Sequence, residues 1–147
     1  MPSPRTEGRD VRVGVLALVE RGDRVLFERR TVDADDRRLW GLLAGGKRAD
    51  ETTVEAARRE VREETGLTFH PERVVCVFDH DSHYDTGTAW TVVALAGPAG
   101  GDPDPDREPG KRDRLEWVSL DDPPAPLHPT TNLFLDAHEN DALHPEL

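Results

Sequence analysis

The amino-acid sequence predicts one domain of the α+β class, in which a central helix and a C-terminal helix pack against several strands. A chain of 147 residues is long enough to bury a core of its own. Apolar and polar residues alternate in several short segments, as in strands, and one longer segment has the period and the ends of a helix. We expect residues 1–10 to form a flexible N-terminal tail and residues 11–147 to form the single domain.

The predicted strands are recognised by their apolar alternation and by the turn residues around them. In Val11–Glu20, the apolar residues on one face are Val11, Val13, Val15, Ala17 and Val19. Further strands are expected at Arg24–Arg29, Arg73–Asp79, Trp90–Ala96 and Leu115–Ser119, and Leu39–Leu43 is again apolar. The segment Gly97–Gly110 is rich in Gly, Pro and Asp and is predicted to be a loop.

The clearest helix is predicted over Thr52–Glu64. Thr52 and Glu55 have the spacing of a capping box, and Gly66 stands where a C-cap glycine belongs. The apolar stripe expected to face the core consists of Val54, Ala57 and Val61. A second helix is expected over Thr131–His138, near the end of the chain.

The composition argues against several classes of partner. A net charge of −11 disfavours binding of a nucleic-acid polymer over a broad surface. No apolar run approaches the roughly 20 residues that a membrane span requires, and Met1–Asp10 lacks the apolar centre of a signal peptide. We therefore expect a cytoplasmic protein without a membrane or nucleic-acid partner. It is expected to be a monomer or homodimer, with its single cysteine, Cys76, buried in a strand.

Three glutamates gather on one face of the predicted helix. At about 100° per residue, Glu60, Glu63 and Glu64 fall within an arc of roughly 100°. Like charges at this spacing repel one another, and Arg59 relieves part of the repulsion by pairing with Glu63. The pattern has two interpretations. It is either a solvent-exposed helix laced with Arg and Glu, or a site for Mg²⁺ or Mn²⁺, which prefer oxygen ligands.

The longer segment around this helix favours the second interpretation. Gly45 is followed after five residues by Glu51 and, after seven more, by the sequence REVREETGL, which ends at Leu67. This spacing resembles the whole signature of the Nudix hydrolases, in which Gly, Glu and Arg-Glu-apolar-x-Glu-Glu-x-Gly-apolar follow one another. The signature covers 23 residues, and the order of the other elements is similar to the family as well.

The resemblance implies an α/β/α sandwich in which this segment forms a loop–helix–loop against a mixed sheet. It also implies hydrolysis of a nucleoside diphosphate linked to another group, with Mg²⁺ or Mn²⁺ as the cofactor. By the same resemblance, Glu60 and Glu64 are the main metal ligands, and Glu63 joins them or acts as the general base. Arg59 and Glu51 are expected to orient the cluster.

One departure from the family pattern concerns the main-chain metal ligand. The usual proline-glycine-glycine is Ala44-Gly45-Gly46 in this chain. The carbonyl ligand is therefore Ala44 by spacing, or Gly45 by the pairing of the glycines. Gly45 and Gly46 are expected to line the substrate site.

Further matches resemble the MutT-like branch, whose members act on nucleoside triphosphates. The segment VLFERRTVDADDRRLWGLLAGG is similar to its second strand and approach loop, and implies that Arg29 contacts phosphate. The segment EPGKRDRLEWVSL resembles a stretch with an extra acidic ligand, here Glu108, which is also the second candidate for the base. PTTNLFL resembles a helix start whose asparagine, here Asn132, contacts the nucleobase, and Tyr84 could stack on it. The alternatives are a surface arginine, a solvated loop glutamate and an ordinary helix residue.

The leading hypothesis is an enzyme that hydrolyses a nucleoside triphosphate to a nucleoside monophosphate and pyrophosphate. Its rival is a hydrolase of nucleoside diphosphate sugars such as ADP-ribose. A third hypothesis is a nucleotide-sensing module without catalysis, but the carboxylates of the signature are all present.

Overall fold

The computed structural model describes residues 10–31, 38–81 and 88–139. Its strands are β1 (Asp10–Arg21), β2 (Arg24–Arg30), β3 (Trp40–Gly46), β4 (Thr68–Phe69), β5 (Arg73–Asp81), β6 (Thr88–Gly100) and β7 (Arg112–Val118). Its helices are α1 (Thr53–Thr65) and α2 (Pro129–Glu139). Tyr84 and residues 1–9 of the predicted tail lie outside the described residues.

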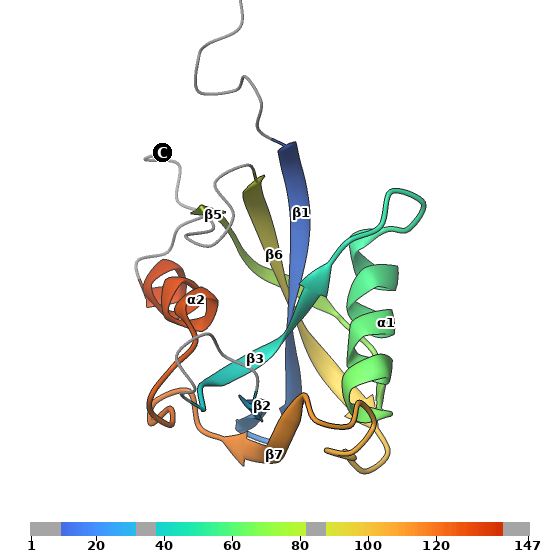
Figure 1. The fold of residues 1–147 in the computed structure, drawn as a ribbon, viewed down its shortest axis with the longest axis vertical. Helices are drawn as coiled ribbons and strands as arrows, with labels where there is room; N and C mark the ends of the chain where they lie inside the picture. The colour runs from blue at the N-terminus through green and yellow to red at the C-terminus, as the bar shows by residue number, and fades with distance from the viewer. Residues whose placement is uncertain (1–9, 32–37, 82–87, 140–147) are drawn as a thin grey trace, which may run out of the picture.

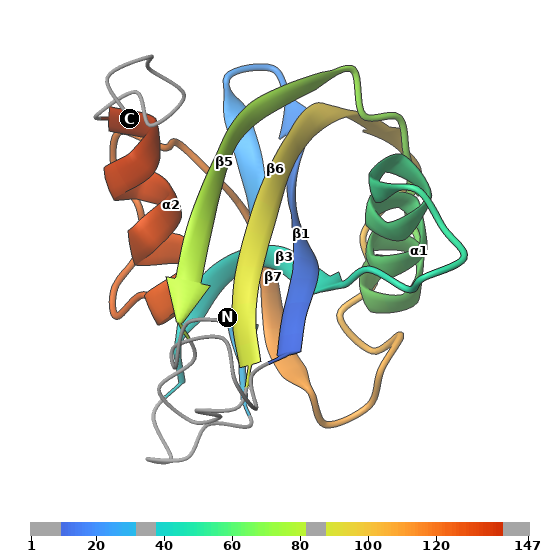
Figure 2. The same ribbon diagram turned by 90° about the horizontal axis from the view of Figure 1, so that it is seen from above.

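The seven strands form one mixed sheet with the order β4-β6-β1-β3-β2-β7, and β5 also pairs with β6. Strands β1 and β6 run parallel, whereas the other pairs are antiparallel. The helices α1 and α2 lie on opposite sides of this curved sheet (Figures 1 and 2). The predicted α+β sandwich is thereby confirmed.

Both faces of the sheet are buried. On the α1 side, Val15, Ala17 and Val19 of β1 belong to one core cluster, as the alternation predicts. On the α2 side, Leu16 and Leu18 belong to a second cluster. A strand covered on both faces has apolar residues throughout, which explains the continuous run GVLALV in the sequence.

The ends of α1 agree with the prediction, but its buried face is different. Thr52 and Glu55 form the capping box, and Gly66 adopts the left-handed conformation with φ 81°. Val54 was predicted to be buried, which is wrong, because it is 37% exposed at the beginning of the helix. The buried residues of α1 are Ala56, Ala57, Val61, Glu64 and Thr65. At about 100° per residue this arc is centred near Glu64, so the glutamate face and the core face overlap.

The predicted loop Gly97–Gly110 is partly wrong, since β6 continues through Gly100. The extension is stabilised by pairing with β4, a strand of two residues that is too short to produce a period in the sequence. Gly97 permits this pairing, because a Cβ there would lie 2.1 Å from the carbonyl oxygen of His70. In a similar way, β3 continues beyond the predicted apolar segment to Gly46. No helix in the described ranges is long and apolar enough to span a membrane.

Candidate active site

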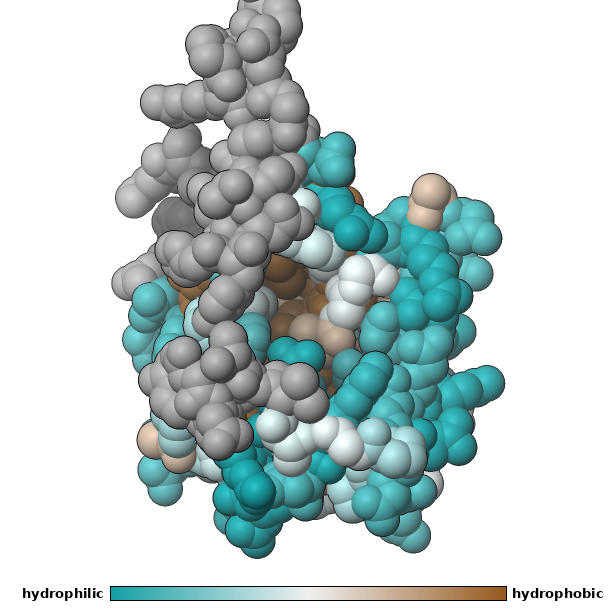
Figure 3. All heavy atoms as spheres, in the orientation of Figure 1, coloured by the Kyte–Doolittle hydropathy of each residue, from teal (hydrophilic) through white to brown (hydrophobic). Residues whose placement is uncertain are grey.

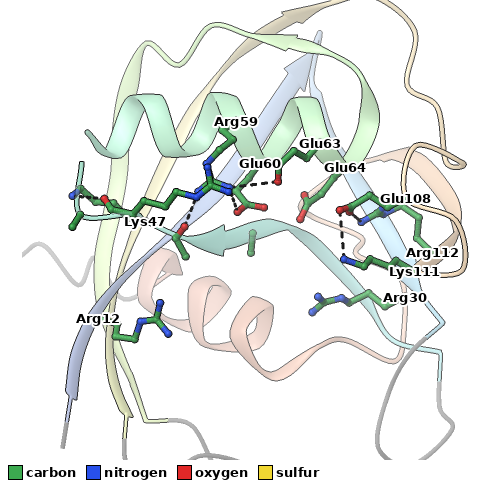
Figure 4. A pocket seen from close by; sticks show the side chains of 14 residues that line it. Arg12, Arg30, Lys47, Arg59, Glu60, Glu63, Glu64, Glu108, Lys111 and Arg112 are labelled. Carbon is green, nitrogen blue, oxygen red and sulfur yellow. Dashed lines mark hydrogen bonds and ion pairs between the residues drawn. The ribbon is translucent and has the colours of Figure 1, made fainter. Parts of the chain in front are cut away.

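A cavity of about 810 Å³ opens between α1, the end of β3 and the loop that precedes β7. Figure 4 shows that Glu60, Glu63 and Glu64 come from α1, whereas Glu108, Lys111 and Arg112 come from the loop before β7 and from the start of β7, beside Glu64. The basic residues of its lining are Arg12, Arg30, Lys47, Arg48, Arg59, Lys111 and Arg112. Ala44 and Gly46 also line this cavity, so the fold brings together most of the residues predicted from the sequence.

The three glutamates of α1 differ in exposure. Glu64 is 5% exposed and continues the apolar stripe of Ala57 and Val61, at offsets of seven and three residues. The side chain of Glu60 is 16% exposed and that of Glu63 is 44% exposed. The carboxylate of Glu64 therefore lies at the edge of the core, that of Glu60 lies at the wall of the cavity, and that of Glu63 lies near solvent.

Burial changes the ionisation of the two inner glutamates. It raises the pKa of Glu64 well above the usual range, and the nearby charges of Glu28 and Glu60 raise this pKa further. Burial also raises the pKa of Glu60, although a hydrogen bond from Arg59 opposes this effect. Both carboxylates therefore stand where a positive ion in the cavity would be stabilising.

Gly45 determines the position of Glu60. A Cβ on residue 45 would lie 2.1 Å from the Glu60 Cδ atom, so no side chain fits between β3 and this carboxylate. Gly45 itself lines a second, smaller cavity, whereas Ala44 lines both cavities. Both residues thus stay candidates for the main-chain ligand, and Ala44 lies on the side of the glutamates.

Arg59 is the centre of a hydrogen-bond network. Its guanidinium donates to both carboxylate oxygens of Glu51, at 3.1 and 2.6 Å, and to the carbonyl oxygen of Gly46 at 2.9 Å. It also donates to Glu60 at 2.7 Å and to Glu63 at 3.4 Å. The hydrogen bonds from Arg59 lower the pKa of Glu51 to about 2, with smaller contributions from Arg48. The network joins the beginning of the signature to its helix.

Glu108 reaches the cavity from the loop before β7. Its Oε1 atom accepts a hydrogen bond of 2.9 Å from Arg112, and its Oε2 atom lies 3.5 Å from the Lys111 Nζ atom. Burial raises the pKa of Glu108, but the hydrogen bond from Arg112 and the charges of both cations outweigh it, so the pKa is lowered overall. Glu108 therefore faces the α1 glutamates as a carboxylate already engaged by two cations.

The oxygen atoms of this site fit a hard divalent cation. Glu64 carries a buried Oε2 atom that has no hydrogen bond within the described residues, and this is costly for a carboxylate. As the side chains stand, no three acidic, histidine or cysteine residues of the described segments form a ready metal cluster. Arg59 and Arg112 instead hold the carboxylates of Glu60 and Glu108. Carboxylate oxygens are the ligands that Mg²⁺ and Mn²⁺ prefer, so the residues fit the predicted cofactor.

A smaller cavity of about 280 Å³ adjoins the first and shares Arg30, Ala44 and Gly46 with it. Its lining also includes Trp90, His80, His128 and Thr131, together with apolar residues of β1, β3 and β6. Figure 3 shows apolar residues at the floor of a hollow in the middle of this face. The combination of an aromatic ring, apolar floor and hydrogen-bonding groups suits a flat heterocycle.

Two predicted contacts lie elsewhere. Arg29 donates two hydrogen bonds to Asp113, at 2.8 and 2.7 Å, and lines neither cavity. Asn132 is exposed on α2 and lines neither cavity, although the adjacent Thr131 does. The roles assigned to Arg29 and Asn132 remain predictions.

Seven charged residues of the site were missed from the sequence. Six of them line the larger cavity, namely Arg12, Arg30, Lys47, Arg48, Lys111 and Arg112, and the seventh, Glu28, accepts a hydrogen bond from Arg112. Two signals for them existed. Glu28 interrupts an apolar strand, and Arg30 shares the strand face of Leu26 and Glu28. Neither signal indicates which face of β2 packs on the side of α1.

Known proteins resemble this chain in sequence and in fold. The sequence model of the NUDIX domain family matches residues 8–137. The 8-oxo-dGDP phosphatase NUDT18 of Homo sapiens is 36% identical over 102 residues, which are 68% of this chain and 29% of that protein. Phosphatase NudJ of Escherichia coli is 38% identical over 63 residues, which are 43% of this chain and 40% of that protein. The chain thus spans less than half the length of these relatives.

Solved structures support the fold. The MutT NUDIX hydrolase from Burkholderia pseudomallei has a TM-score of 0.75 and 30% identity, covering 87% of this chain and 98% of that one. An ADP-ribose pyrophosphatase from Streptococcus suis has a TM-score of 0.62 at 23% identity, covering 91% of this chain and 93% of that one. The second likeness concerns the fold alone.

Proposed function

The chain belongs to the Nudix family, and from this premise we propose that it hydrolyses a nucleoside triphosphate to a nucleoside monophosphate and pyrophosphate, with Mg²⁺ or Mn²⁺. The observation that carries the proposal is the junction of two cavities. One is lined by glutamates and cations, the other by Trp90 and apolar residues. Together they match the two ends of a nucleotide.

The excess of positive side chains around the larger cavity supports binding of the phosphate groups there. The whole chain has a net charge of −11, yet seven Lys and Arg residues and only four glutamates line this cavity. Arginine and lysine are the side chains that pair best with phosphate oxygens. A local positive excess on an acidic protein favours a small, highly charged anion over a polymer.

Glu60 and Glu64 are the residues that would hold the metal ion, with Glu63 beside them and Ala44 as the candidate main-chain ligand. A bound divalent cation supplies neutralisation of the phosphate charge and lowers the pKa of a bound water. Arg59, which also lines the cavity, restrains Glu60 and Glu63 through hydrogen bonds at 2.7 and 3.4 Å. The side chains can thus be kept in place before the substrate binds.

In the proposed reaction, the oxygen of a water molecule attacks phosphorus, the bridging P–O bond breaks, and pyrophosphate leaves. A carboxylate takes the proton of the water. Glu63 is the first candidate for this base, because it is the most exposed glutamate of α1 that lines the cavity. Glu108 is the second candidate, although Arg112 and Lys111 already engage both of its oxygen atoms.

A nucleoside diphosphate is the second candidate substrate, because the matched human relative is named as an 8-oxo-dGDP phosphatase. Two other outcomes are covered by the same test. One is hydrolysis of nucleoside diphosphate sugars, and the other is binding of a nucleotide without turnover.

The experiment is a panel of nucleoside triphosphates, diphosphates and diphosphate sugars, assayed with Mg²⁺ and with Mn²⁺. Released pyrophosphate, phosphate and sugar phosphate are quantified separately. We expect metal-dependent pyrophosphate release from triphosphates. Phosphate release from diphosphates alone would move the assignment to the second candidate, and no turnover with either metal would refute the hydrolase proposal.

A further inference from the structure

A buried ion pair adjoins the larger cavity, which Arg112 lines. The Arg112 Nε atom donates to Glu28 Oε1 at 2.8 Å, and the two side chains are only 4% and 3% exposed. Glu28 comes from β2 and Arg112 is the first residue of β7, and these strands are neighbours in the sheet. The pair is thus held by the backbone on both sides.

The same guanidinium also holds the loop carboxylate. The Arg112 Nη2 atom donates to Glu108 at 2.9 Å, so Glu28, Arg112 and Glu108 form a chain from the sheet to the cavity. The planar guanidinium has a fixed fork of donors, and fixing one edge on Glu28 therefore fixes the direction of the other. Glu28 and Glu108 are thus connected through one guanidinium.

Backbone hydrogen bonds hold both ends of the loop of Glu108, but its carboxylate depends on Arg112 and Lys111. At the near end, the Thr31 amide donates to the Lys111 carbonyl oxygen at 3.1 Å, and the Thr31 hydroxyl donates to the Gly110 carbonyl oxygen. The Asp104 amide donates to the Thr65 carbonyl oxygen at 2.9 Å, which ties the far part of the loop to the end of α1. Beside Glu108, the Lys111 Nζ atom is 3.5 Å away on a side chain that is 64% exposed. An exposed lysine at this distance constrains a carboxylate weakly. The buried arginine is the firmer anchor.

Stability is a poor explanation for this pair. Burying two charges costs free energy of hydration, and this cost can exceed the free energy gained from their mutual attraction. Replacing such a pair by well-packed apolar residues of similar size often leaves the protein equally stable. The Arg112 Nη1 atom is also buried without a hydrogen-bond partner among the described residues, which adds to the cost. The pair is therefore costly, and the Arg112 guanidinium that it holds also binds Glu108 in the cavity. This combination points to a role in the site.

We propose that Glu28 and Arg112 are positioning residues, which hold the carboxylate of Glu108 against the glutamate face of α1. This inference rests on the proposed function for the part that Glu108 takes in the reaction. The anchor itself is a property of the protein alone and can be measured without substrate.

The first test replaces the pair by apolar residues of similar volume, in the double variant Glu28→Leu/Arg112→Met. Hydrogen exchange of residues 101–111 should become faster, while the rest of the protein keeps its exchange rates and its Tm. Affinity for Mn²⁺, followed by calorimetric titration, and kcat should each fall about 10–100-fold, as for other residues that orient ligands. KM is compared in Glu28→Gln, where it should change little, because Glu28 does not line the cavity whereas Arg112 does.

The second test is a double-mutant cycle between Glu28→Gln and Glu108→Gln. If Glu28 acts through Glu108, then Glu28→Gln should lower kcat in the native background but have no further effect in the Glu108→Gln background. Additive effects would show that Glu28 acts by another route and would overturn the proposal. The milder Glu28→Gln also keeps the test valid if the apolar double variant does not fold.

The matched control is Glu20→Gln, which removes the charge and one of the two acceptor oxygens that Arg73 uses, at 2.9 and 2.7 Å, between two other strands. Exchange of residues 101–111 and Mn²⁺ affinity should be unchanged in this variant. Unchanged exchange in both Glu28 variants would also overturn the anchor. If the native protein hydrolysed no nucleotide, the proposed function would fail, while exchange and Mn²⁺ titration would still decide the anchor.

Discussion

The carboxylate of Glu60 packs directly against the backbone of Gly45, at a place where a Cβ would lie 2.1 Å from the Glu60 Cδ atom. This contact couples the glycine at the beginning of the signature to the first glutamate of its helix. It explains why the position requires glycine, although φ there is not in the left-handed region. The requirement is one of space.

We predict that Gly45→Ala lowers kcat/KM by about a hundredfold or more, because the new methyl group displaces a metal-holding carboxylate. The measurement is steady-state kinetics with circular dichroism as a check of folding. Gly100→Ala is the control, since a Cβ there meets no atom of the described residues within 4 Å. Native-like activity in a folded Gly45→Ala protein would remove Glu60 from the metal site.

Glu64→Gln should lower turnover by at least about a hundredfold and abolish tight Mg²⁺ binding in calorimetry. In the absence of metal ions the same variant should be more stable than the native protein, because it no longer buries a carboxylate with an unpaired oxygen. A gain of about 1 kcal/mol corresponds to a Tm higher by about 2–4 °C. A variant that is both folded and fully active would exclude Glu64 as a ligand.

The pH dependence of this stability difference has a definite sign. The ordinary pKa is 4.5, and burial raises the pKa of Glu64 in the folded state. Between these two values the folded protein binds more protons than the unfolded chain, so the metal-free native protein loses stability as the pH rises. The variant lacks this loss. Thermal melts should therefore show a Tm difference that opens above pH 4.5 and becomes constant above the raised pKa.

The loop over residues 101–110 should become more protected when substrate binds. Its position beside Glu108 and its Gly, Pro and Asp content favour closure over a bound nucleotide. Hydrogen exchange measured with Mg²⁺ and a non-hydrolysable triphosphate should be slower there than with Mg²⁺ alone. If saturation leaves the exchange unchanged, the loop does not close over the substrate.

The two adjacent arginines of β2 should differ in effect. Arg30→Ala should lower kcat/KM for every nucleotide by about 10–100-fold, the equivalent of one charged hydrogen bond to phosphate. Arg29→Ala should cause a smaller loss, because Asp113 already holds its guanidinium. A larger loss in Arg29→Ala would support the sequence-based assignment of Arg29 to phosphate.

Asn132→Ala tests recognition of the nucleobase. If Asn132 hydrogen-bonds a base edge, the variant should flatten the ranking of purine and pyrimidine triphosphates by about 1–3 kcal/mol. Trp90→Leu should instead lower kcat/KM for all of them, since stacking depends little on the base. A ranking that survives Asn132→Ala would mean that Asn132 does not read the base, and base discrimination would then lie with other residues.

Local physics made the central helix and its glutamates predictable. A capping box, a C-cap glycine and a helical period depend on residues three or four positions apart, so the sequence is sufficient to assign Thr52, Glu55 and Gly66 to the helix ends. The alternation of β1 was predictable for the same reason. The exposure of Val54 was not, because it depends on which side of α1 meets the sheet.

The sequence by itself thus determined the fold class, the helix α1 and the family signature with its glutamates. Only the tertiary structure decided that Arg30 rather than Arg29 lines the cavity, and that Glu28 pairs with Arg112 across 84 residues. The physical reason is the range of the interactions. Helix ends and periods are set by neighbours along the chain, whereas the register of β2 on β7 sets which charges meet.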